Sequence, residues 1–165
     1  MANSSIIGIA KNKIIKEFIK DDEIVKAIDS HDITSPEKLV NTHIFNYHQN
    51  PNTIDTAGTF ITIQVHIPEY YSRYESDDVF VKPIIEIWII SHERHMVVDN
   101  IPKVTDNRND YLSKLIDKKL NKKSGFGIGT LRLTTNIEGS FQKDFLYRKM
   151  VFKCVDLNNS LCRDE

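Results

Sequence analysis

An alternating stretch near the middle of the chain constrains the fold more than any other feature. From Ile61 to Ile67 every second residue is Ile or Val, and Thr, Gln and His stand between them. Because successive side chains of a strand point to opposite faces, Thr59 to Ile67 is predicted to form one half-buried antiparallel strand. A second run, Val79 to Ile90, is apolar on both faces, which predicts a central strand or a second buried surface, with Pro83 marking its start.

Two other stretches repeat apolar residues at the three- and four-residue steps of a helix. In the first, Lys11 to Ile28, the acidic trio Asp21–Asp22–Glu23 interrupts the repeat, so we predict two short helices with the trio opening the second. The second, Asn107 to Lys122, is the most helical stretch of the chain, and its last turns are basic. Asn107 or Asn109 is the predicted N-cap of this helix.

Helix and strand breakers in the second half of the chain predict where the remaining strands lie. Ser124 to Gly129 contains three glycines and is predicted to connect the central helix flexibly to a strand. Strand-like runs follow at Thr130–Ile137 and Phe145–Asp156, with Glu138–Gly139–Ser140 predicted to separate them. A short strand, Met96–Val98, is predicted after a turn at His92–His95.

This order of elements favours the α+β class. We predict a mostly antiparallel β-sheet with N-terminal helices and one central helix packed on it, because the elements show neither βαβ alternation nor an internal repeat. The 165 residues are predicted to form a single domain, residues 1–165, which has a helical part at residues 1–35 and a frayed tail at residues 158–165.

Charge and apolar content exclude several classes of protein. The chain has 22 Lys and Arg against 23 Asp and Glu, which gives a formal net charge of −1. A basic nucleic-acid binder or an acidic disordered chain would depart far from this balance. No apolar stretch approaches the roughly 20 residues needed to span a bilayer, so we expect a soluble protein. Cys154 and Cys162 lack a CxxC spacing and are expected to be free thiols.

Enzyme motifs are weakly represented. His92-Glu93-Arg94-His95 resembles a zinc motif, but its histidines are three residues apart in a predicted turn, whereas HExxH places them four apart on a helix. Gly125, Gly127 and Gly129 follow a helix and precede a strand, the reverse of the order that cradles a phosphate. We therefore expect no enzymatic activity, no catalytic residues, no metal site and no cofactor.

The segment Glu69–Asp78 is the strongest candidate for contact with another protein. It is polar, has no apolar period and is predicted to protrude as a loop. Aromatic residues and Arg are the types enriched in interface hot spots. The candidate interface residues are Tyr70, Tyr71, Arg73 and Tyr74 of this loop, and His92, Arg94 and His95 of the later turn. The alternative is a tyrosine-rich loop that packs on its own domain.

Two blocks of the sequence resemble the small virion proteins of tailed bacteriophages that complete the neck or terminate the tail. The first block runs from the strand PIIEIWIISHERH through a Pro-containing link into a helix with the pattern Arg108, Asp110, Leu112, Ile116 and Leu120. The second block, DFLYRKMVFKCVD at residues 144–156, is similar to the last strand of these proteins. That strand commonly carries an aromatic residue, an Arg and alternating apolar residues.

The resemblance implies a non-enzymatic protein of the virion, assembled in the host cytoplasm. Such proteins form a ring, commonly a homohexamer, that joins the connector to the tail tube and lets DNA pass through its channel. The implied partners are further copies of the chain, the connector or neck protein and the tail-tube protein, with no membrane. The resemblance leaves open whether the chain is a tail terminator, a head-closure protein or another neck component.

The balanced charge suits such a conduit, because a ring that surrounds DNA must let it move. Charge is also balanced along the chain, apart from Asp21–Glu23 and the basic end of the helix at Asn107–Lys123. Strong, salt-sensitive DNA binding by the isolated protein would contradict this function. Two alternatives remain: a small host- or partner-binding regulatory module that uses the aromatic loop, and a metalloenzyme that depends on some of the histidines.

Overall fold

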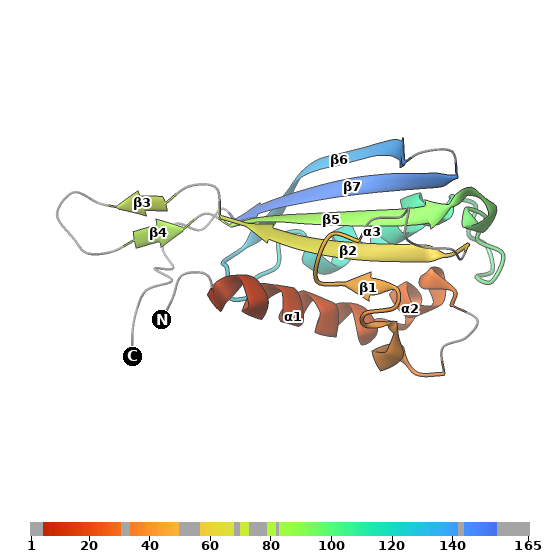
Figure 1. Ribbon diagram of the computed structural model, residues 1–165, viewed down its shortest axis with the longest axis horizontal. Coiled ribbons are helices and arrows are strands. Elements are labelled where there is room, and N and C mark those ends of the chain that lie inside the picture. The colour runs from red at the N-terminus through yellow and green to blue at the C-terminus, as the bar shows by residue number, and fades with distance from the viewer. Residues whose placement is uncertain are drawn as a thin grey trace.

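A five-stranded sheet forms the centre of the molecule (Figure 1). The computed structural model describes residues 5–30, 34–49, 57–67, 70–72, 79–81, 83–141 and 144–154. In sheet order, the strands are β1 (Ile44–Phe45), β2 (Thr59–His66), β5 (Ile84–His92), β7 (Phe145–Cys154) and β6 (Leu131–Phe141). Neighbouring strands pair antiparallel, except β1 with β2, which is parallel. The predicted mostly antiparallel sheet is confirmed, and β5 is its central strand.

Three α-helices pack on one face of this sheet: α1 (Ser5–Ile19), α2 (Asp22–Ile28) and α3 (Arg108–Leu120). Figure 1 shows α3 behind β2 and β5, while α1 runs along the side of the sheet where β1 and β2 lie. Within the described connections, two short 3-10 helices form: η1 (Pro36–Leu39) and η3 (Glu93–His95). The α+β class with N-terminal helices and one central helix on the sheet is confirmed.

Capping side chains fix the helix boundaries. Asp21 separates α1 from α2, and its carboxylate accepts hydrogen bonds from two backbone amides in the first turn of α2, at 3.1 and 3.3 Å. Burial alone would raise the pKa of Asp21, but hydrogen bonds from Lys119 and these amides hold it below its ordinary value. Asn107 caps α3 by accepting a hydrogen bond from the amide of Asp110 at 2.9 Å. The predicted starts of α2 and α3 are confirmed, whereas α1 begins at Ser5, before the predicted stretch.

Alternation along β2 and β5 builds the core. One face of each strand presents Ile or Val to the helices, and the four-residue repeat of α3 presents its own apolar side chains to the sheet. Burying one such side chain contributes about 1.5–3 kcal/mol. Fully buried members of this core are Ile14, Phe18, Ile61, Ile63, Ile85, Ile87, Ile89, Leu112, Ile116, Leu120 and Phe152.

The segment predicted as a protruding loop contains a strand. Tyr70–Ser72 forms β3, which pairs antiparallel with β4 (Val79–Val81) in a separate two-stranded sheet. Aromatic and β-branched residues favour strands, which is why Tyr and Val pair here despite the polar surroundings. Figure 1 shows this pair beyond the end of the main sheet. Residues 73–78, between the two strands, lie outside the described residues.

The predicted strand Met96–Val98 is wrong. Its backbone carbonyls are taken by Arg108, whose amide donates to Met96 at 2.8 Å and whose guanidinium donates to Val97 at 2.7 Å. The segment therefore follows η3 as irregular backbone that is fixed to the start of α3.

The predicted break at Glu138–Gly139–Ser140 is also wrong. β6 continues through it to Phe141, which pairs with Phe145 across the reversal of the chain. Gly139 serves a close approach instead of a turn, because a Cβ there would lie 2.5 Å from the phenol ring of Tyr147. The end of the predicted strand Phe145–Asp156 and the predicted tail at residues 158–165 fall outside the described residues.

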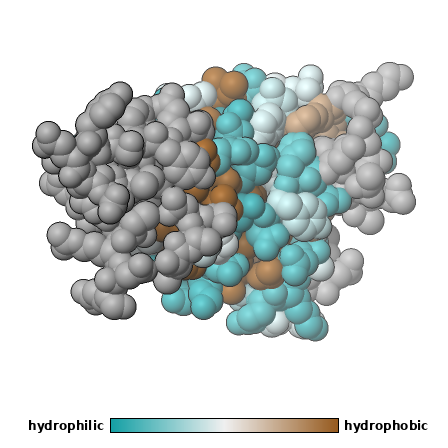
Figure 2. Space-filling view, turned by 60° about the vertical axis from the view of Figure 1, so that its left-hand side comes forward, coloured by the Kyte–Doolittle hydropathy of each residue, from teal (hydrophilic) through white to brown (hydrophobic). Residues whose placement is uncertain are grey.

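The outside of the molecule is mainly polar in the view of Figure 2. Hydrophilic side chains cover most of the coloured surface, and apolar side chains form a limited band among them. The helices that the structure describes include none with the length and apolar character to cross a membrane.

Candidate functional site

Arg108, at the start of α3, is the largest fully buried side chain among the described residues, with 1% exposure. Its planar guanidinium presents donors in several directions, and all the bonds it makes join separate parts of the chain. Nε donates to the carbonyl of His95 (2.6 Å), Nη1 to that of Ala27 (2.7 Å), and Nη2 to Val97 (2.7 Å) and to Asp29 Oδ2 (3.3 Å). Arg108 therefore ties the end of α2 and the segment after η3 to α3.

A carboxylate balances this buried charge. Asp29 follows α2 with a φ of 52°, a left-handed conformation that Asp tolerates better than most residues. Burial lowers the pKa of Arg108, whereas the negative charges of Asp29 and Asp99 raise it. The guanidinium stays cationic, because an arginine side chain is not deprotonated in proteins. Asp29 Oδ2 also lies 3.4 Å from Nε2 of His95.

A chain of buried hydrogen bonds continues from His95 into the sheet. Asn109 donates from Nδ2 to the carbonyl of Leu146, so its Oδ1 is the acceptor for the Ser91 hydroxyl at 2.7 Å. Ser91 has one proton, so the Thr59 hydroxyl must donate to Ser91 at 2.9 Å. Nδ1 of His95 then donates to Thr59 at 2.8 Å. The network fixes the position of the proton on Nδ1.

Asp29, His95 and Thr59 have the residue types of a nucleophilic triad, but their geometry differs from one. Thr59 and Ser91 are each 0% exposed, so neither hydroxyl is placed to meet a substrate. The Thr59 hydroxyl also accepts a hydrogen bond from His95, whereas a nucleophile that is activated by a general base donates its proton to that base. The network joins β2, β5, η3 and α3, which is a structural role.

The three turn residues predicted as interface candidates differ in their surroundings. Arg94 is exposed on η3. His92 is half-buried, and its ring lies edge-on to Phe145 with the ring centroids 5.1 Å apart. His95 faces inward, with 17% of its side chain exposed and Nδ1 bonded to Thr59. Of the three candidates, Arg94 is therefore the most accessible to another molecule, whereas His95 is mainly engaged within the fold.

Of the four interface candidates in the segment Glu69–Asp78, two have a described backbone position. The backbone of Tyr70 and Tyr71 lies in β3, whereas Arg73 and Tyr74 lie outside the described residues.

The residues of the helix pattern have two roles. The apolar members Leu112, Ile116 and Leu120 are fully buried in the core. The polar members make ion pairs: Arg108 with Asp29, and Asp110 with Arg148 of β7. The pattern thus describes how α3 packs on the sheet.

The described residues hold no group of three or more His, Cys, Asp or Glu side chains arranged to bind a metal ion. Cys154, at the end of β7, is half-buried and is not in a disulfide with any described residue, and Cys162 lies outside the described residues.

A row of aromatic rings on the sheet face opposite the helices was missed by sequence reasoning. The aromatic row consists of Trp88, Phe141 and Tyr147, with His48 lying against it. Ring centroids are 4.9 Å apart for Trp88 and Tyr147, and 4.8 Å apart for Phe141 and Tyr147. His48 lies 5.7 Å from Trp88. The sequence did carry one indication of this row, because Val79–Ile90 has apolar residues on both faces and so predicted a second buried surface. It did not indicate which aromatic residues would pack there.

Beside the aromatic row lies an open edge of the sheet. Among the described strands, β6 pairs with β7 on one side and with no strand on the other. Ile137, near the middle of β6, is 50% exposed. A register shift between Leu133 and Thr135 marks an irregularity in the pairing of β6.

The chain belongs to the YomW family, whose model matches residues 12–154. No curated protein matches it.

Proposed function

We propose that the chain is a non-enzymatic structural protein of a phage virion, at the head–tail neck or the tail terminus. It forms a ring that joins the connector to the tail tube and lets DNA pass. The observation that carries this proposal is the open edge of β6 beside the aromatic row.

An open edge favours assembly because it presents unpaired backbone donors and acceptors to another chain. β6 is 11 residues long, longer than a typical strand of five or six residues. A ring forms when each copy uses one surface to contact a different surface of the next copy and the rotation closes. The β6 edge is one of these two surfaces, and the aromatic row adds apolar area that a neighbour can cover.

The same edge carries features that limit non-specific pairing. Arg132 and Glu138 place charges of opposite sign along β6, with Glu138 in an ion pair with Arg148, and the register shift interrupts its regularity. Ile137 lies between them as an exposed apolar side chain. This combination supports docking of a matching surface in one register over open-ended aggregation.

The test is assembly of the purified full chain, measured by light scattering after size exclusion and by electron microscopy, alone and with the tail-tube protein. We expect rings for the wild type in at least one of these conditions. Ile137→Lys places a charge on the β6 edge and should leave a folded monomer. Ile9→Lys is the matched control, because Ile9 is an exposed apolar residue on α1, on the other face of the sheet.

Two results would contradict the proposal. One is a wild-type chain that stays monomeric alone and with the tail-tube protein. The other is assembly of Ile137→Lys to the same extent as Ile9→Lys.

A further inference from the structure

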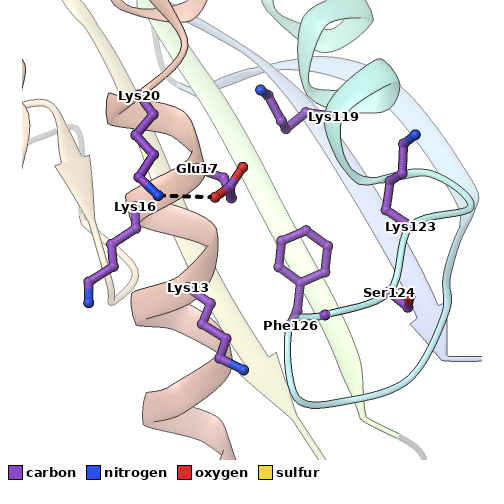
Figure 3. Close-up of a pocket in the computed structure, with 9 residues that line it drawn as sticks. Lys13, Lys16, Glu17, Lys20, Lys119, Lys123, Ser124 and Phe126 are labelled. Atoms are coloured by element: carbon purple, nitrogen blue, oxygen red, sulfur yellow. Dashed lines mark ion pairs between the residues drawn. The ribbon is translucent and has the colours of Figure 1, made fainter.

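Lysines from distant parts of the chain gather around one groove. The groove has a volume of about 560 Å³ and lies between α1 and the loop that follows α3 (Figure 3). Its lining residues are Lys13, Lys16, Glu17, Lys20, Lys119, Lys123, Ser124, Gly125 and Phe126. The sequence showed the basic end of α3 but gave no indication that the lysines of α1 lie beside it.

The groove keeps a positive charge after its internal ion pairs are formed. Lys20 pairs with Glu17 at 3.6 Å, and Lys119 pairs with Asp21 at 2.8 Å. The remaining lysines form no ion pair with the described residues and are exposed: Lys13, Lys16 and Lys123. These three unneutralised charges around the groove contrast with the net charge of −1 of the whole chain, although the ammonium group of Lys16 points to the side of α1 away from Phe126 (Figure 3).

The arrangement suits an extended row of phosphates better than a compact anion. α1 and α3 line the groove with their C-terminal parts, so neither of these two helices directs N-terminal amide donors at a single anion. Lys13 and Lys16 of α1, and Lys20 directly after its end, are spread over seven residue steps, or about 10 Å along the helix axis. One strand of B-DNA carries about three phosphates over that length of the duplex axis.

The aromatic ring in the floor of the groove favours a duplex over a single strand as the ligand. Proteins that bind single strands stack bases on accessible aromatic rings. The ring in this groove, Phe126, is only 6% exposed, and Figure 3 shows it between the lysines of α1 and those of α3 and its loop. Backbone contact without stacking is the mode of non-specific duplex binding.

We propose that this groove binds the phosphate backbone of double-stranded DNA, without reading its sequence. This inference does not depend on ring formation. With three phosphate contacts, the logarithm of the affinity should fall with the logarithm of the salt concentration with a slope of about −2.7. Between about 50 and 200 mM salt the affinity then falls about 40-fold. A loss of this size by physiological salt is compatible with DNA that moves through a channel.

The experiment is fluorescence anisotropy of a short labelled duplex of mixed sequence, titrated with the full chain at several salt concentrations. The wild type should bind at about 50 mM salt with the slope given above. The groove variant Lys13→Gln/Lys16→Gln/Lys123→Gln should bind at least 10-fold more weakly and lose most of the salt dependence. Circular dichroism checks that each variant is folded.

The matched control removes the same charge elsewhere. Lys26→Gln/Lys103→Gln/Lys153→Gln changes three exposed lysines outside the groove. It should keep most of the affinity and the wild-type slope. The proposal is overturned by absence of wild-type binding at about 50 mM salt, by equal losses in the two triple variants, or by tighter binding of a single strand than of the duplex.

Discussion

Replacement of Arg108 by Met is the sharpest test of the internal architecture. The buried guanidinium is the donor for three backbone carbonyls and for the carboxylate of Asp29. Met has similar length and is apolar, so it fills the space but leaves all four acceptors without their donor. Removing one partner of a buried ion pair costs about 3–5 kcal/mol, because the other charge stays buried and unpaired. We expect Arg108→Met to lose about 4 kcal/mol of unfolding free energy.

The assay is urea unfolding followed by circular dichroism. For a slope of about 2 kcal/mol per molar urea, a loss of 4 kcal/mol lowers the unfolding midpoint by about 2 M. Arg108→Lys keeps the charge but not the planar fork, so its loss should be about half as large. In the double variant with Asp29→Asn, the combined loss should be at least about 1 kcal/mol smaller than the sum of the single losses.

Lys118→Met is the matched control, because Lys118 is an exposed cation on the same helix. Its effect should stay within about 0.5 kcal/mol of the wild type. If Arg108→Met is no less stable than this control, the reasoning about the buried guanidinium is refuted.

Three further predictions test other parts of the structure. Gly139→Ala should lower the free energy of unfolding, measured by heat or urea, by about 1–3 kcal/mol, because the new methyl group meets the ring of Tyr147. Gly8→Ala has open space around it in α1 and should stabilise the protein by about 0.5–1 kcal/mol. Equal effects of the two substitutions would contradict this reasoning. The pKa of Asp21 is lowered on folding, so its carboxylate stabilises the fold above its unfolded pKa of about 4, and this contribution is lost as the pH falls through the folded pKa. Asp21→Asn keeps a capping side chain and should lower the free energy of unfolding by about 0.5–1 kcal/mol at pH 7. Unfolding curves recorded at decreasing pH should show this difference from the wild type disappear in acid. A difference that stays constant with pH would refute the prediction. Tyr71→Ala together with Arg73→Ala should reduce ring assembly seen by electron microscopy, and normal rings and infectious particles would reject these residues as contacts.

Local patterns predicted most of the fold. The alternation of Ile in β5 and the four-residue repeat of α3 follow from how side chains are placed on a strand and a helix, and Asn107 marks its helix start through a bond within the same turn. Gly139 misled the prediction because a glycine serves both turns and close approaches. The residue that makes Gly139 a close approach is Tyr147, which lies on the neighbouring strand β7 and not next to Gly139 in the sequence.

The sites depend on contacts between distant residues and were less predictable. Arg108 was expected only as part of a helix pattern, yet one of its acceptors, the carbonyl of Ala27, lies 81 residues away. The lysines of the groove come from α1 and from the end of α3, so their common location follows from packing rather than from local sequence. The open edge of β6 depends on strand order, which periodicity does not determine.

The most direct test of the ring function is inactivation of the gene in the genome that carries it, followed by electron microscopy of the particles made when phage production is induced. A protein of the neck or tail terminus should leave DNA-filled heads and tails that are not joined, and the wild-type gene supplied in trans should restore joined particles. Complete, infectious particles without the protein would contradict the account.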